Sequence, residues 1–145
     1  MRHTASGLAI PDFPTMGGTW IPTFSETMIN NINVILFDMD IGMVNRYQVI
    51  IHFTHRLGAL IISGTIGYFL YRHGHLIKKN KIVMNTIRWI VILLLLQLAL
   101  GVFTVLSERS PYIASFHVVT GAAFLGFCAL FVLRCHPIRW VDWKS

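Results

Sequence analysis

Residues 83–106, with the sequence VMNTIRWIVILLLLQLALGVFTVL, decide the fold of this chain. After Arg88 the stretch contains no charged residue, and Gln97 is the one strongly polar side chain near its middle. At about 1.5 Å of rise per residue, a helix of this length is long enough to cross a hydrocarbon core of about 30 Å. The stretch therefore predicts a transmembrane helix.

Two further apolar runs, residues 47–71 and 111–133, predict the same structure. The second run begins with Pro111, and proline suits the first position of a helix. The link between residues 106 and 111 is so short that the helices on either side of it must be antiparallel neighbours. The predicted fold class is therefore an all-α membrane protein with three transmembrane helices, at about 47–71, 83–106 and 111–133.

The composition supports a membrane protein and argues against a soluble one. Of the 145 residues, 54% are hydrophobic and 12% are charged, which is too apolar for an ordinary soluble domain. The basic residues lie just outside the apolar runs instead of gathering on one solvated face, so membrane lipid is the expected partner and nucleic acid is not. Cys128 and Cys135 stand two helical turns apart, too far for a disulfide, and are expected to be free thiols.

Residues 1–46 differ from the rest of the chain. Prolines and glycines interrupt any regular element here, while several aromatic side chains suit a layer packed at a membrane interface. Residues 28–37 are interpreted as a short surface helix or a packed loop. We therefore expect two domains, an N-terminal cap (1–46) and a transmembrane helical bundle (47–145).

The distribution of positive charge predicts the orientation. Eight of the twelve Lys and Arg residues lie between residues 72 and 88 or after residue 133. Because positively charged loops remain on the cytoplasmic side, these segments should face the cytoplasm. The cap and the link at 107–110 should then lie outside.

Two histidines, His55 and His117, are the candidate functional residues. Both helices that carry them enter from the outer side, and both rings should lie roughly 9 to 12 Å below the outer interface. Hydrocarbon offers imidazole nitrogens no partner, so each histidine is either held by a neighbouring helix or bound to a metal. Two imidazoles on facing helices can supply both axial ligands of a haem iron. The pair thus predicts a bis-histidine haem site; histidines that bridge helices by hydrogen bonds are the plainer alternative.

Three neighbouring side chains extend this candidate site. Arg56, nearer the outer interface than the hydrocarbon centre, could pair with a haem propionate. His52, one turn before His55, could be a ligand, a ring-edge contact or the hydrogen-bond partner that orients His55. Gln97 is interpreted as an interhelical hydrogen-bonding residue, with contact to a haem edge as the alternative.

Four segments, in this order, resemble the haem A synthase family. They are RHT (2–4) with GLAIPDFP (7–14), HRLGA (55–59), LQLALG (96–101) and FHVVTGA (116–122). The family oxidises a methyl group of haem O to the formyl group of haem A for cytochrome oxidase assembly. Its usual member has eight transmembrane helices in two four-helix halves, each with a histidine pair. One half binds the haem substrate and the other binds a haem b cofactor.

The chain resembles the C-terminal, cofactor half of that family. His52 agrees with this, because the catalytic half has a glutamate at the corresponding place; the loop's cysteine pair is replaced by Ile10 and Met16. The resemblance implies a haem b bound by His55 and His117, with Arg56 and His52 as further cofactor-binding residues. It also implies a four-helix half-bundle whose first helix would precede Met1.

The resemblance implies partners and a location as well. The haem O site would lie in a missing N-terminal half or in a partner chain, and haem O synthase and an oligomer are further expectations. The expected location is the cell inner membrane. As part of a complete enzyme the chain would be an oxidoreductase; whether it is an enzyme alone stays open, and its catalytic residues are unknown.

Two other functions remain open on the sequence alone. One is a non-catalytic b-type cytochrome, a haem-binding module for electron transfer. The other is a structural membrane subunit whose histidines only bridge helices. The sequence shows no glycine-rich phosphate loop, Cys-x-x-Cys zinc pair or serine nucleophile elbow, which argues against the common classes of soluble enzyme.

Overall fold

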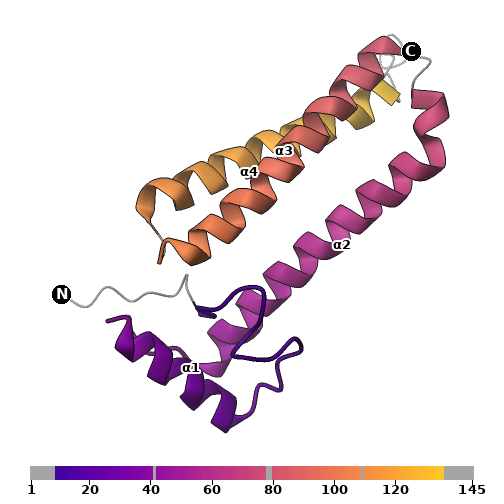
Figure 1. Cartoon of the computed structure of the whole chain (residues 1–145). Helices are drawn as coiled ribbons and strands as arrows, with labels where there is room; N and C mark the ends of the chain where they lie inside the picture. The colour runs from indigo at the N-terminus through magenta and orange to yellow at the C-terminus, as the bar shows by residue number, and fades with distance from the viewer. Residues whose placement is uncertain (1–8, 41, 78–79, 109, 136–145) are drawn as a thin grey trace, which may run out of the picture.

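The computed structural model describes residues 9–40, 42–77, 80–108 and 110–135, and four helices run through them (Figure 1). These are α1 (Glu26–Asp38), α2 (Arg46–Ile77), α3 (Lys81–Leu106) and α4 (Pro111–Cys135). Within these residues no β-strand forms beyond one isolated bridge between Met16 and Thr19. The predicted all-α fold is confirmed. The RHT motif at 2–4 and the basic tail after residue 135 lie outside the described residues.

Helices α2, α3 and α4 are each long and apolar enough to span a membrane, as predicted. The most apolar window has a mean hydropathy of 2.6 in α3 and 2.1 in α4, but 1.4 in α2. The sequence explains the lower value, because α2 carries His52, Thr54, His55 and Arg56 near its start. The protein itself buries few residues of these helices, which leaves their apolar side chains to contact lipid. The chain is thus built as a multi-pass membrane protein.

The helix ends differ from the predicted ones where packing or capping extends them. Helix α2 continues six residues beyond position 71, and its last residue, Ile77, is buried in a cluster with Ile87 and Ile90 of α3. Helix α3 begins two residues earlier than predicted, because the side chain of Asn80 accepts hydrogen bonds from the N–H groups of residues 82 and 83. The predicted helix ends were set by local polarity alone, which shows neither the burial of Ile77 nor the capping by Asn80.

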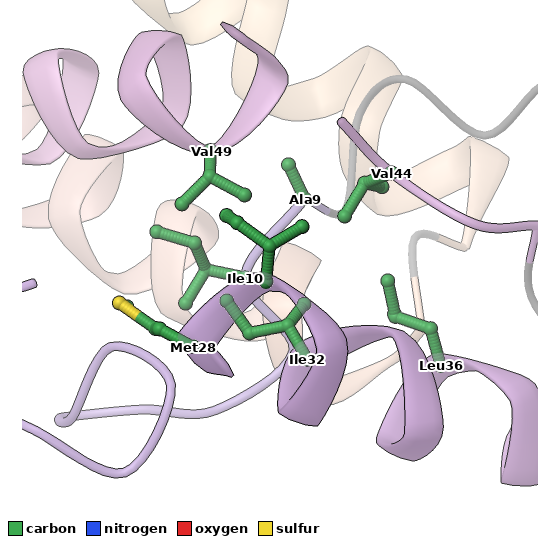
Figure 2. Packing of buried hydrophobic residues seen from close by; sticks show 8 residues of the cluster. Ala9, Ile10, Met28, Ile32, Leu36, Val44 and Val49 are labelled. Carbon is green, nitrogen blue, oxygen red and sulfur yellow. The ribbon is translucent and has the colours of Figure 1, made fainter. Parts of the chain in front are cut away.

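Residues 28–37 lie within a helix, α1, one of the two predicted alternatives. Ser25 caps its start by accepting a hydrogen bond from the N–H of Met28 at 3.2 Å. One face of α1 packs onto the segment around Ile10 and onto Val49 at the start of α2 (Figure 2). The fully buried members of this cluster include Ile10, Ile32 and Val49, so apolar packing seats the cap on α2. We use "the cap" below for the described residues before α2.

Helices α3 and α4 form an antiparallel pair, whereas α2 diverges from them toward the end that carries the cap (Figure 1). At the other end all three helices meet in a second apolar cluster, in which the rings of Phe69 and Phe131 lie 5.7 Å apart. There Arg134 of α4 also donates a hydrogen bond to the hydroxyl of Thr86, a fully buried residue of α3. The helices are therefore joined firmly at this end, and the candidate histidines lie toward the other.

Candidate functional site

The structure brings His55 and His117 together across the space between α2 and α4. Their ring centroids are 6.3 Å apart and their planes meet at 76°. His117 is half-buried and His55 is exposed in the isolated chain. The two residues are 62 positions apart in sequence, and their imidazoles lie in one small region, in agreement with their equal predicted depth.

The two ring centroids are about as far apart as those of imidazoles on opposite sides of one metal ion, while in the structure the nitrogens of His117 lie beside Gln97 and Gly101 of α3. With metal–nitrogen bonds of about 2.0 Å, and each nitrogen about 1.1 Å from its ring centre, rings on opposite sides of one metal have centroids about 6 Å apart. No group of three or more His, Cys, Asp or Glu side chains that could hold a metal occurs in the described part of the chain. A metal held by this pair would therefore need its other ligands from a bound molecule.

Gln97 of α3 contacts the same histidine, as the predicted interhelical hydrogen bond required. Its side-chain nitrogen Nε2 lies 3.3 Å from Nε2 of His117. An amide nitrogen donates and does not accept, so a hydrogen bond between these atoms has the ring nitrogen as acceptor, and in a neutral ring it places the proton on Nδ1. Nδ1 of His117 and Oε1 of Gln97 are both buried without a partner among the described residues. Buried polar atoms are rarely left in this state, so the pair marks a polar site.

Two glycines leave room for this contact, and the sequence alone did not predict a role for either of them. A Cβ atom added at Gly121 of α4 would lie 2.9 Å from Nε2 of Gln97. One added at Gly101 of α3 would lie 3.3 Å from Cε1 of His117. The absence of a side chain at each glycine therefore leaves space for the side chains of Gln97 and His117. In the sequence, the one indication of this role is that the two glycines lie in the segments 96–101 and 116–122, which also contain Gln97 and His117.

Arg56 points its guanidinium at the backbone of the cap. Its Nη1 donates to the carbonyl of Thr15 at 3.1 Å, and its Nη2 donates to the carbonyls of Ile10 and Asp12 at 3.2 and 3.1 Å. Three of its five N–H groups are used in this way. The structure thus gives Arg56 a role that the sequence did not predict, and pairing with a propionate stays a prediction for the other two.

His52 also binds the cap. Its Nδ1 accepts a hydrogen bond from the backbone N–H of Ile10 at 3.1 Å. A neutral imidazole has one nitrogen with a free lone pair, and here that lone pair is used. Metal binding by His52 through Nδ1 would therefore cost the bond to Ile10. No spacing rule in the sequence indicates this contact, because its two partners are 42 positions apart.

Asp12 shapes the loop whose carbonyls Arg56 binds. Its carboxylate accepts hydrogen bonds from the hydroxyl of Thr15 at 2.5 Å and from the N–H groups of Gly17 and Gly18 at 2.8 and 2.9 Å. Both glycines have positive φ angles, +64° and +77°, which side chains rarely tolerate. Partial burial raises the pKa of Asp12, but these hydrogen bonds outweigh it and hold the pKa below its usual value.

The comparisons with known proteins give one match. The sequence model of the COX15-CtaA family, described as cytochrome oxidase assembly protein, matches residues 1–129. The matched span includes the cap, α2, α3 and most of α4, and with them His52, His55, Arg56 and His117. No curated protein and no solved structure matches the chain.

Proposed function

The chain belongs to the COX15-CtaA family of cytochrome oxidase assembly proteins, and on this premise we propose that it holds one haem b between His55 and His117. Membership gives it a role in cytochrome oxidase assembly and haem A synthesis. The observation that carries the proposal is the 6.3 Å spacing of the two rings, from two different membrane helices. A porphyrin would supply the other ligands of the iron, so two histidines would be enough to hold it.

The surrounding residues suit such a group. Helices α2 and α4 diverge toward the cap (Figure 1), and the rings of His55 and His117 lie 6.3 Å apart between them. Oε1 of Gln97 and Nδ1 of His117 are buried without a hydrogen-bond partner among the described residues, which also supports a site that can bind a polar group. The two remaining N–H groups of Arg56 would bind a propionate while the others hold the cap.

When bound, the haem supplies one-electron transfer, and the protein supplies its position and surroundings. His55 and His117 would hold the haem from α2 and α4, and the cap, held by His52 and Arg56, covers the neighbouring end of α2. In the complete enzyme this half would pass electrons toward the half at which the methyl group of haem O becomes a formyl group. That haem O half, in the same or a partner chain, haem O synthase and a second copy of the protein are the proposed partners.

We place the protein in the inner membrane, with the cap outside and the C-terminus in the cytoplasm. The support is the gathering of basic residues in the α2–α3 connection, the start of α3 and the tail. In this orientation both histidines lie in the outer half of the membrane, toward the end of α2 that carries the cap.

The test is the absorption spectrum of the full chain, purified from haem-replete cells into lipid nanodiscs. We expect the spectrum of a low-spin, bis-histidine b-type haem, and its loss or strong perturbation in His55→Ala and in His117→Ala. His75→Ala is the matched control, because His75 is exposed and lies twenty residues, about 30 Å, further along α2. Wild-type spectra in both the His55 and the His117 variants would contradict the assignment.

A further inference from the structure

The hydrogen bond between Gln97 and His117 has a consequence for ligand binding. A nitrogen binds iron through its lone pair, and Nε2 of His117 uses that lone pair to accept from Gln97. The other ring nitrogen, Nδ1, carries the proton and is buried on the side of α3, 3.9 Å from the position of a Cβ at Gly101. The nitrogen that has a lone pair to give is therefore already occupied.

We propose that Gln97 is a positioning residue that holds His117 against α3 and competes with haem iron for Nε2 of His117. This inference rests on the proposed haem-binding role of His117. For Nε2 of His117 to hold a haem iron, its lone pair would have to be released by the N–H of Gln97, while the ring proton would stay on Nδ1. In the absence of haem the same hydrogen bond satisfies a nitrogen that hydrocarbon would otherwise leave without a partner.

Substitution of Gly121 offers a second, independent way to break the hydrogen bond between Gln97 and His117. Its missing side chain is what lets the amide of Gln97 reach His117, since an added Cβ would approach Nε2 of Gln97 to 2.9 Å. That atom is the far end of a flexible side chain, so Gly121→Ala should displace the amide while leaving the helix intact. Alanine is otherwise favourable inside a helix. Gln97→Met and Gly121→Ala should thus have the same effect through two different helices.

The first experiment detects the hydrogen bond between Gln97 and His117 in the absence of haem. In haem-free full chain with ¹⁵N-labelled histidine, in nanodiscs, the ¹⁵N shifts of His117 should show a protonated Nδ1 and a hydrogen-bonded, unprotonated Nε2. Gln97→Met and Gly121→Ala should each shift the Nε2 resonance toward that of an unbonded nitrogen. Thr104→Val is the matched control, because Thr104 is a half-buried polar residue of α3 that donates only to Leu100 of its own helix in the structure.

The second experiment titrates protohaem into the same four proteins and into the double variant Gln97→Met with Gly121→Ala. A net hydrogen bond of ordinary strength corresponds to roughly a twofold to tenfold change in an equilibrium constant. Both variants should bind haem that much more tightly than the wild type, and Thr104→Val should not. The double variant should gain no more than either single one, because both changes remove the same bond.

The outcomes separate this inference from the proposed function. If the wild type shows the bis-histidine spectrum but both variants bind haem like the control, Gln97 does not compete and the inference fails alone. Weaker haem binding in both variants would overturn it too, by showing that Gln97 supports the ligand. If the wild type binds no haem, the proposed function fails and the competition with it, even where the ¹⁵N shifts show the hydrogen bond.

Discussion

The backbone N–H of Ile10 donates to Nδ1 of His52 at 3.1 Å, while the carbonyl of the same Ile10 accepts from Arg56 at 3.2 Å. Both side chains come from the first third of α2, one turn apart, on either side of the candidate ligand His55. The side chain of Ile10 is fully buried in the cluster of Figure 2. One residue of the cap is thus held through its donor, its acceptor and its apolar side chain, beside the candidate haem site.

Replacement of His52 should loosen the cap and leave haem ligation intact. His52→Ala leaves the N–H of Ile10 without an acceptor, which we expect to cost about 1–3 kcal/mol in the free energy of cap opening. Hydrogen exchange of the cap amides measures it. His52→Asn is the matched control, because its amide oxygen can accept at the place of Nδ1. Loss of the low-spin haem spectrum in His52→Ala would instead identify His52 as a ligand.

Arg56 should resist conservative replacement. Lysine keeps the charge but lacks the planar fork that binds three carbonyls at once, so Arg56→Lys should lower the free energy of cap opening by about 1.5–3 kcal/mol. Arg46→Lys is the control, since Arg46 forms an exposed ion pair with Glu26 and its change should cost at most about 1 kcal/mol. Equal hydrogen exchange in the two variants would show that the carbonyl contacts contribute little.

The cap should loosen in acid because of Asp12. Its pKa is lowered in the folded chain, so its carboxylate stabilises the loop fully above the ordinary pKa of 3.8. That contribution is lost as the pH falls below 3.8 and through the lowered pKa. The amides of Gly17 and Gly18, measured by NMR, should lose their hydrogen bonds over this range. Asp12→Asn should remove this transition; its persistence in that variant would assign it to another group.

The far end of the bundle should depend on Thr86. Its buried hydroxyl accepts a hydrogen bond from Arg134, and Thr86→Val keeps the shape but leaves Arg134 without this acceptor. We expect a loss of about 1–3 kcal/mol in the free energy of unfolding in detergent. Thr104→Val is the matched control, because its hydroxyl bonds only its own helix in the structure. Equal losses in both variants would show that the link to Arg134 adds nothing.

The sequence predicted the membrane helices well because hydropathy over about twenty residues is a local property. The ends were less predictable. Helix α2 continues through the polar residues Arg72 and His73 to Ile77. The burial of Ile77 against α3 stabilises these last turns, which the polarity of the segment alone does not indicate. Whether the cap is a separate domain stays a prediction. Free thiols at Cys128 and Cys135 were predicted from spacing along one helix and are confirmed.

The site was predictable only in part, for a related reason. Topology predicts a similar depth for His55 and His117, because their helices run the same way, and in the structure their ring centroids lie 6.3 Å apart. The contacts of His52 and Arg56 with the cap depend on how an irregular segment folds back onto α2, and no periodicity encodes that. The role of Gly121 beside Gln97 likewise appears only when α3 and α4 are packed together.

The central claim, one iron between His55 and His117, is tested most directly by electron–nuclear double resonance of the ferric, haem-loaded chain with ¹⁵N-labelled histidine. The account predicts two iron-bound histidine nitrogens in the wild type, one fewer in His55→Ala and in His117→Ala, and both retained in His52→Ala. Two bound histidine nitrogens that persist when either His55 or His117 is replaced would contradict it.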